Sequence, residues 1–182
     1  SVTEGHSGTK LLVFSLSLSV ASGQLISVSY ATADGTADNS DYVPARGMVS
    51  FAPGETSKAV SIIINGDVFN EADETFTVNL HGVVNATLGD GQGTGTILND
   101  DGVPSLSISD VSVIEGNSGT VRAVFTVSLS SASGQAVGVS YATADGTADG
   151  SDYVPASGVL SFAVGELHQT LVVLVNGEVF NE

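Results

Sequence analysis

The chain of 182 residues contains no cysteine and no tryptophan. Without cysteine, disulfide bonds, thiolate metal sites and cysteine nucleophiles are excluded. Basic residues are scarce as well, because four Lys and Arg face 20 Asp and Glu, which gives a net charge of -16. Such a charge repels nucleic acid and anionic membranes, so we expect neither as a partner. No apolar run approaches the roughly 20 residues that a membrane-spanning helix needs, so we expect no membrane insertion by this segment.

An internal repeat organises what is present. Residues 1–71 and 112–182 align without a gap at an offset of 111, and 45 of the 71 pairs are identical. The longest shared block is Tyr-Ala-Thr-Ala-Asp-Gly-Thr-Ala-Asp, at 30–38 and again at 141–149. Solenoid repeats span roughly 20–50 residues, so a period of this length indicates whole domains in tandem.

Apolar and polar residues alternate in short runs, as at 13–18, 26–30 and 76–80. Such alternation predicts half-buried strands, and no window has the apolar spacing of a helix. We therefore predict an all-β fold, an immunoglobulin-like seven-stranded antiparallel β-sandwich in tandem modules. The predicted strands are A at 105–113, B at 10–18, C at 25–32, D at 46–51, E at 57–64, F at 75–80 and G at 93–98, with B to E repeated 111 residues later.

The two copies overlap only in part. We expect module 1 at 1–101, which lacks most of strand A, and module 2 at 102–182, which lacks strands F and G. A sandwich without F and G exposes sheet edges and half of its core. We therefore expect module 2 to be disordered, rearranged or completed by strands from a neighbouring molecule.

The acids of module 1 are unevenly distributed over the predicted strand ends. If successive strands alternate in direction, strands A, C, E and G end at one pole and B, D and F at the other. Ten acids then fall at the first pole: Glu4, Asp34, Asp38, Asp41, Asp67, Glu71, Asp73, Glu74, Asp100 and Asp101. Only Glu55 and Asp90 fall at the second. The alternative, that acids merely solvate loops, predicts acids at both poles.

Ten carboxylates at one end of a small domain repel one another and raise each other's pKa unless cations join them. Calcium suits such a site because it takes 6–8 oxygen ligands from irregular loops, whereas magnesium demands stricter geometry. Zinc and copper would need His or Cys, and we expect no histidine to converge here. Asp41-Tyr42 and Asp152-Tyr153 are expected to pin the loop between strands C and D rather than to bind a ligand.

Several segments carry a family resemblance. Residues 34–42 (Asp-Gly-Thr-Ala-Asp-Asn-Ser-Asp-Tyr), 47–55, 67–76 and 95–101, in this order and spacing, resemble the Calx-beta domain. The resemblance covers nearly the whole chain and implies a seven-stranded immunoglobulin-like sandwich. Such domains occur in sodium–calcium exchangers, in an integrin beta subunit and in tandem arrays of large bacterial surface proteins.

In calcium-binding members of that family, the ions lie in the loops at one pole. Carried over to this sequence, the resemblance implies these metal ligands: Glu4, Asp34, Asp67, Glu71, Asp73, Glu74, Asp100 and Asp101 in module 1, and Glu115, Asp145, Glu178 and Glu182 in module 2. Strong binders tend to carry aspartates where this chain has Asn65-Gly66 and Asn176-Gly177, and Asn99 opens the terminal acidic run. We therefore expect weaker binding or fewer ions than in the exchanger domains.

The resemblance implies a non-catalytic, calcium-binding repeat module of an exported or cell-surface protein that acts in adhesion or cell communication. Calcium would order the acidic loops and stiffen the joint between modules. Expected partners are neighbouring Calx-beta modules, or another copy by strand exchange or head-to-tail contact. Two alternatives stay open: a calcium-sensing regulatory domain of a membrane transporter, and a glycosidase that uses paired carboxylates.

Overall fold

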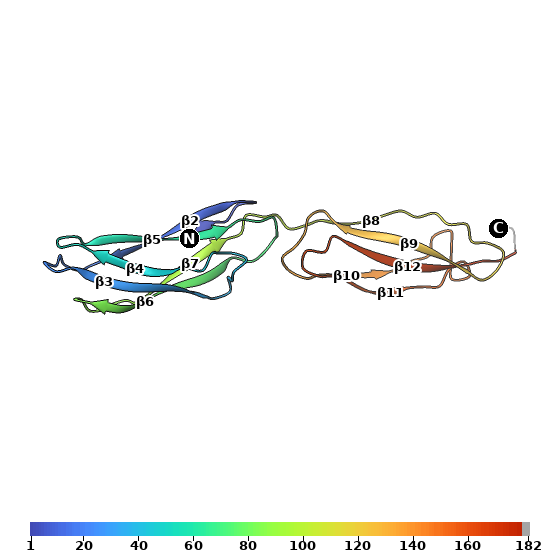
Figure 1. Ribbon diagram of the computed structural model, residues 1–182. Coiled ribbons are helices and arrows are strands. Elements are labelled where there is room, and N and C mark those ends of the chain that lie inside the picture. The colour runs from blue at the N-terminus through green and yellow to red at the C-terminus, as the bar shows by residue number, and fades with distance from the viewer. Residues whose placement is uncertain (180–182) are drawn as a thin grey trace. The chain divides into compact units, whose positions relative to one another are not determined.

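The structure, a computed structural model, describes residues 1–179 and divides into two compact units, Ser1–Asp101 (unit 1) and Gly102–Glu182 (unit 2). Within the described residues both units are built from strands and turns, without a helix, as the alternating pattern predicts (Figure 1). No described segment forms a helix long and apolar enough to cross a membrane. The all-β prediction is therefore confirmed.

Unit 1 is a two-layered sandwich of seven strands. The strands are β1 (Val2–Thr3), β2 (Thr9–Ser17), β3 (Ile26–Asp34), β4 (Arg46–Phe51), β5 (Ser57–Asn65), β6 (Glu74–Val84) and β7 (Gln92–Leu98). One sheet has the order β1-β7-β6-β3-β4, and the other pairs β2 with β5. All pairs are antiparallel except β1 with β7, which run parallel. In this pair the structure differs from the predicted wholly antiparallel sandwich.

The core of unit 1 lies between the two sheets and is centred on an aromatic cluster. The ring of Phe76 stacks on Tyr42 with centroids 4.3 Å apart and meets Phe14 edge-on at 5.9 Å. Gly95 on β7 makes room for this cluster, because a Cβ there would lie 2.7 Å from the Phe76 ring. The alternation of β2 and β5 turns Leu12 and Ile62 inward against the same cluster.

Unit 2 repeats the pairing of its counterpart strands. It contains β8 (Leu106–Ile108), β9 (Thr120–Leu129), β10 (Val137–Ala142), β11 (Ser157–Phe162) and β12 (His168–Asn176). These form a three-stranded sheet, β12-β9-β8, and a two-stranded sheet, β10-β11. The pairs β9–β12 and β10–β11 keep the register of β2–β5 and β3–β4 at the offset of 111. These strands therefore pair as their counterparts in unit 1 do, and the expectation that module 2 is disordered, rearranged or completed by a neighbouring molecule stays a prediction.

Strand A of unit 2 is shorter than predicted. It was expected at 105–113, but β8 ends at Ile108. The counterparts of Val2 and Thr3 in β1 are Val113 and Ile114, and these two residues are not in a strand. In unit 1 the strand partner of β1 is β7, and residues 102–179 contain no counterpart of β7. Without that partner strand, Val113 and Ile114 have no ladder hydrogen bonds to form, so they are not part of a strand.

Candidate metal centre

In unit 1, strands β1, β3, β5 and β7 all end at one end of the sandwich, which we call the acidic pole. Strands β3 and β7 are each antiparallel to β6, and β1 is parallel to β7, so these three point the same way. The Glu4 amide donates to the Leu98 carbonyl at 3.2 Å, which joins the ends of β1 and β7. The Asn65 amide donates to the Asp41 carbonyl at 2.8 Å, which brings the end of β5 to the loop after β3.

Asp41, Glu71 and Glu74 form one carboxylate cluster at this pole. Each offers an oxygen, and these oxygens lie within 4.8 Å of one another. Asp41 is only 6% exposed, and it accepts hydrogen bonds from the Asp38 amide at 2.7 Å and the Ser40 hydroxyl at 3.1 Å. Burial, a hydrogen bond with Asp41 and repulsion from Asp41 and Glu71 raise the pKa of Glu74 to about 8. Burial and the neighbouring acids also raise the pKa of Glu71.

His6, Asp100 and Asp101 form a second cluster, again with ligand atoms within 4.8 Å. His6 Nδ1 lies 2.9 Å from Asp101 Oδ1 and 3.8 Å from Asp100 Oδ1. The side chain of Asp101 is 7% exposed, and its second oxygen, Oδ2, is buried without a hydrogen-bond partner. A buried carboxylate oxygen without a partner is costly unless a cation or a proton satisfies it. The expectation that no histidine joins the acids is wrong for His6.

Glu4 connects the two clusters. It directly follows β1 and is 3% exposed. Burial raises its pKa to about 7, and repulsion from Asp67, Glu71, Asp101 and Asp100 adds to the rise. Because both clusters repel Glu4, the acids form one continuous group rather than two independent sites.

Glycine and asparagine shape the loops that carry these acids. A Cβ on Gly66 would overlap the carbonyl oxygen of Gly5, so the loops after β1 and β5 are in backbone contact. Aspartate in place of Gly66 would not fit this arrangement. Asn70 and Asn99 donate from Nδ2 to the Asp101 carbonyl at 2.9 and 3.1 Å, which fixes the backbone of that acid. The asparagines thus position a carboxylate rather than supply one.

The acids of this pole have little compensating positive charge within the described residues. Among the Lys and Arg side chains of the described residues, one ion pair with a carboxylate forms, between Lys58 and Glu55 at 2.8 Å, and neither residue belongs to the clusters. Lys10 donates to the Thr3 carbonyl at 2.7 Å instead. A partly buried group of acids that offers mainly hard oxygen donors, with an unsatisfied Asp101 oxygen, fits a hard divalent cation such as calcium.

Of the eight ligands expected in unit 1, the two clusters contain four, Glu71, Glu74, Asp100 and Asp101. Glu4 and Asp67 lie outside the clusters, and repulsion from Asp67, Glu71, Asp101 and Asp100 adds to the raised pKa of Glu4. Asp34 is exposed at the end of β3, and its Oδ1 accepts a hydrogen bond from the Tyr42 hydroxyl at 2.5 Å. Asp73 is exposed too, and its Oδ1 accepts from the Asn99 amide at 3.1 Å. These two carboxylates belong to neither cluster and support the loops around them.

Sequence reasoning left out two members of the clusters, Asp41 and His6. Asp41 does pin the loop between β3 and β4, as expected, but it also faces Glu71 and Glu74. The sequence did indicate that Asp41 could belong to the site, since it is one of the ten acids assigned to this pole. His6 lies two residues after Glu4 in the loop after β1, and its proximity to Asp101 depends on the pairing of β1 with β7.

Unit 2 holds only part of this arrangement. Glu115 and Glu178 are half-buried and Asp145 is exposed, with its Oδ1 accepting from the Tyr153 hydroxyl at 2.6 Å. Within residues 102–179, no three His, Asp or Glu side chains have ligand atoms that all lie within 4.8 Å of one another. Glu182, also expected as a ligand, lies outside the described residues.

Fold and site together define the class of this chain as a tandem β-sandwich protein with an acidic pole in unit 1. The family model of the Calx-beta domain matches residues 1–102 and again 98–182. The chain therefore belongs to the Calx-beta domain family, and the resemblance seen in the sequence is confirmed.

Comparison with individual proteins gives partial matches. The chain is 47% identical over 68 residues to sodium/calcium exchanger 2 of Rattus norvegicus, and 48% identical over 58 residues to sodium/calcium exchanger 1 of Canis lupus familiaris. These matches cover 36% and 31% of this chain, but it spans only 7% and 6% of the exchangers' length. A solved structure, the calcium binding domain CBD12 of CALX1.1, is 26% identical, with a TM-score of 0.48, over 89% of this chain and 67% of that one.

Proposed function

We propose that this chain is a calcium-binding, non-catalytic module of an exported or cell-surface protein. The observation that carries the proposal is the acidic pole of unit 1, where the buried Asp101 has an unpartnered oxygen beside the carboxylates of Glu4 and Asp100. Membership of the Calx-beta family supports the same reading, since a solved relative is described as a calcium binding domain. Calcium would neutralise the repulsion among these acids and satisfy that oxygen.

Calcium bound there would order the loops after β1, β5 and β7. Asp100 and Asp101 are the last residues of unit 1, directly before Gly102, so an ion that holds them would stiffen the joint between the units. Neighbouring Calx-beta modules are the proposed partners, with strand exchange or head-to-tail contact with another copy as further modes of association.

Calorimetric titration of calcium into chelator-treated protein, with melting followed in parallel, tests the proposal. We expect saturable heat and a rise in Tm, because an ion that binds only the folded state stabilises it. If millimolar calcium produces neither heat nor a shift in Tm, the metal-binding function is wrong.

Two variants locate the site. Asp101→Asn removes a buried charged ligand and should weaken calcium binding at least about tenfold, equivalent to about 1.4 kcal/mol. Asp34→Asn keeps an acceptor for the Tyr42 hydroxyl and should have a much smaller effect, because Asp34 lies outside both clusters. Asp90→Asn, in the turn before β7, is the control at the opposite pole. An equal loss of affinity in all three variants would contradict the assignment.

A regulatory calcium sensor of a membrane transporter is the second candidate, and the similarity to sodium/calcium exchangers favours it. A sensor must change the angle between its modules when calcium binds, whereas an element of a surface array needs only a fixed angle. Small-angle scattering with calcium and with chelator distinguishes the two. A change in maximum dimension supports the sensor, and an unchanged curve supports the array.

A further inference from the structure

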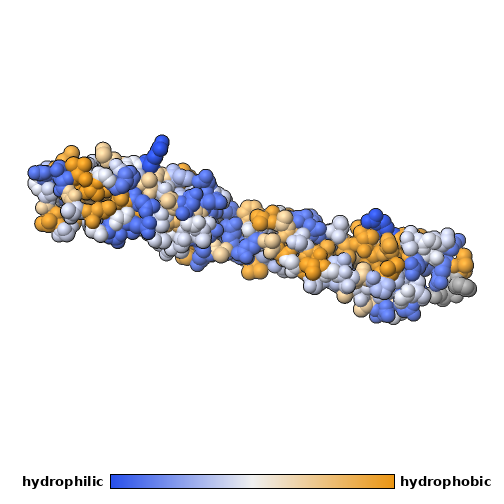
Figure 2. Space-filling view, turned by 90° about the horizontal axis from the view of Figure 1, so that it is seen from below, coloured by the Kyte–Doolittle hydropathy of each residue, from blue (hydrophilic) through white to orange (hydrophobic). Residues whose placement is uncertain are grey.

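His6 differs from the other two histidines of the chain in its neighbours. Among the described residues, it is the histidine whose ring lies close to carboxylate oxygens, those of Asp100 and Asp101. His81 is exposed on β6, and the ring of His168 contacts a serine hydroxyl at 2.9 Å. Hydrophilic side chains lie across the surface of both units (Figure 2), so exposure alone does not distinguish His6. Its contact with two aspartates does.

His6 Nδ1 and the two aspartate oxygens have the spacing of metal ligands. Nδ1 lies 2.9 Å from Asp101 Oδ1 and 3.8 Å from Asp100 Oδ1, and the ligand atoms of the three residues all lie within 4.8 Å of one another. Two ligands of a tetrahedral zinc ion lie about 3.3 Å apart, because each is about 2.0–2.1 Å from the metal. The two measured separations lie on either side of that value, so small side-chain movements would place these atoms around one ion.

The carboxylate of Asp101 has an oxygen that its histidine contact does not satisfy. The side chain is 7% exposed, and Oδ2 is buried without a hydrogen-bond partner. A hydrogen bond from His6 satisfies Oδ1 only, whereas a cation beside the carboxylate neutralises charge that both oxygens share. A purely structural contact between histidine and aspartate would therefore leave this buried group incompletely compensated.

Hydrogen bonds from the surrounding loops hold both aspartates in place. The Gly5 amide donates to Asp100 Oδ1 at 3.0 Å. Asn70 and Asn99 donate to the backbone carbonyl of Asp101 at 2.9 and 3.1 Å. Outer hydrogen bonds of this kind orient metal ligands in proteins. The two carboxylates are thus positioned by groups that are not themselves ligands.

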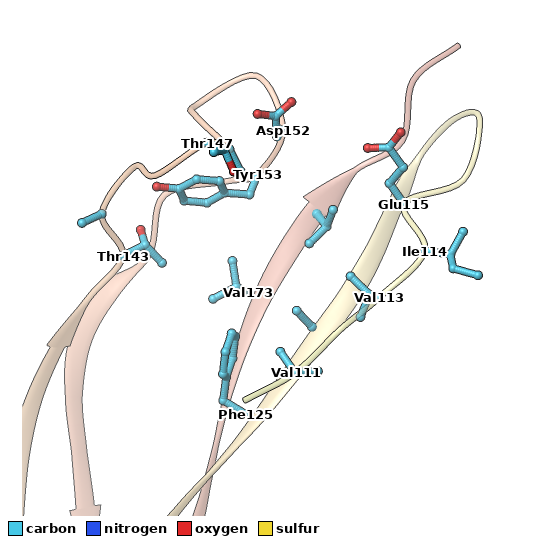
Figure 3. A pocket seen from close by; sticks show the side chains of 14 residues that line it. Val111, Val113, Ile114, Glu115, Phe125, Thr143, Thr147, Asp152, Tyr153 and Val173 are labelled. Carbon is cyan, nitrogen blue, oxygen red and sulfur yellow. The ribbon is translucent and has the colours of Figure 1, made fainter. Parts of the chain in front are cut away.

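Unit 2 has the same loop without the histidine. At the offset of 111, the counterpart of His6 is Asn117. The two glycines that flank Asn117 have φ angles of 83° and 75°, close to the 80° and 76° of their counterparts in unit 1. Figure 3 shows this end of unit 2, where Glu115 and Asp152 lie at the upper end of a pocket. Asparagine is therefore compatible with the loop, and it keeps an N–H donor for a neighbouring aspartate.

We propose that His6, Asp100 and Asp101 bind a borderline transition-metal ion such as zinc. Calcium takes oxygen ligands and does not explain an imidazole nitrogen among the acids, whereas imidazole suits zinc, copper and nickel. Three protein ligands leave a fourth position for water, as in zinc sites that are open to solvent. The side chains of His6 and Asp100 are 64% and 36% exposed, so the ion has access from solvent. The site does not require calcium elsewhere at the acidic pole, because its three ligands are complete without the other acids.

Zinc titration of the full 182-residue chain, freed of metal and in calcium-free buffer, tests the site. We expect calorimetry to show one zinc site, and NMR to show shifts in the ring signals of His6 but not in those of His81 and His168. The variant His6→Asn should bind zinc at least about tenfold more weakly, while the matched control His81→Asn should bind it as the parent does. Equal zinc affinity of the parent and His6→Asn, or an equal loss in both variants, overturns the inference.

Calcium titration of the same variants separates this site from the proposed calcium function. His6→Asn should lose at least about tenfold more zinc affinity than calcium affinity, because it keeps all the carboxylate ligands. Equal losses for the two ions would mean that His6 positions the loop rather than binds a metal, which overturns the inference. Zinc binding through His6 in a protein that does not respond to calcium supports this site and contradicts only the calcium function. Calcium binding without zinc binding overturns this site alone.

Discussion

Burial and mutual repulsion hold two carboxyl groups of the acidic pole, those of Glu4 and Glu74, partly protonated near neutral pH. The pKa of Glu4 is raised to about 7 and that of Glu74 to about 8, in each case mainly by burial. In the metal-free protein, bound protons therefore neutralise part of the negative charge that a cation would otherwise neutralise. Because calcium binds the ionised carboxylates, protons and calcium compete for the same oxygens.

Calcium affinity should consequently rise with pH. Between pH 6 and pH 8.5, Glu4 and Glu74 lose their protons, so the cost of displacing those protons falls. We expect the Kd for calcium to fall by at least about tenfold over this range. Calorimetry in buffers with different ionisation enthalpies should also show proton release at pH 7. A Kd that is independent of pH would mean that these two groups do not contact the ion.

The stability of the metal-free protein should show the opposite trend. Both pKa values are raised above the reference value of 4.5, so between these limits the folded state binds more protons than the unfolded state. The free energy of unfolding then decreases as pH rises from about 4.5 to about 8. Thermal melts in chelator should show Tm falling over this range. Saturating calcium should flatten or reverse the slope, and a Tm that rises with pH in chelator would contradict the assignment.

The strands of unit 1 approach one another closely where glycine faces the aromatic cluster. Gly95 of β7 lies against Phe76 and Leu12, and a Cβ at that position would come within 2.7 and 2.9 Å of their side chains. Phe76 belongs to the neighbouring strand β6 of the same sheet, whereas Leu12 belongs to β2, so the close approach to Leu12 holds β7 against the opposite sheet. These contacts also fix the position of the last residues of β7, from which Asp100 and Asp101 extend into the acidic pole.

Gly95→Val should therefore weaken both the fold of unit 1 and its metal site. Overpacking of this kind costs about 1–3 kcal/mol, so we expect a lower midpoint in urea unfolding and weaker calcium binding. Gly89→Ala is the matched control, because nothing lies within 4 Å of a Cβ at that position. If Gly95→Val unfolds at the same urea concentration as Gly89→Ala, the close approach is not required.

The two units differ in how much core they bury, although their sequences are so similar. The main cluster of unit 1 contains 13 buried residues, whereas that of unit 2 contains four, which are Val127, Leu129, Phe162 and Leu171. In unit 1, strands β6 and β7 contribute Phe76, Val78 and Ile97 to the core. Residues 102–179 contain no counterparts of these strands, so the buried cluster there is smaller.

The 182-residue chain should unfold in two steps. Unit 2 buries less apolar surface, so it should unfold at the lower urea concentration, and unit 1 at the higher one. Calcium should move only the second transition, because in the described residues the carboxylate clusters belong to unit 1. Urea titration followed by tyrosine fluorescence, with and without calcium, measures both midpoints. A single transition that calcium shifts as a whole would mean that the units unfold as one.

The strand pattern and the repeat were readable from the sequence because alternation has a period of two and the copies align at a constant offset. Predicted strand D, at 46–51, coincides with β4, and predicted strand G, at 93–98, differs from β7 by one residue. Strand A, predicted at 105–113, was too long, because β8 ends at Ile108 and the strand state of the residues beyond it depends on a partner strand.

The sequence by itself determined that acids gather at one end of unit 1, since strand direction alone assigns each loop to a pole. Only the tertiary structure decided which carboxylates face one another. Asp34 and Asp41 lie in the same loop region, yet Asp34 accepts a hydrogen bond from Tyr42 while Asp41 faces Glu71 and Glu74. That division depends on the packing of Tyr42 against Phe76 of β6. A contact between segments so far apart in the chain leaves no periodic pattern or fixed spacing in the sequence from which it could be predicted.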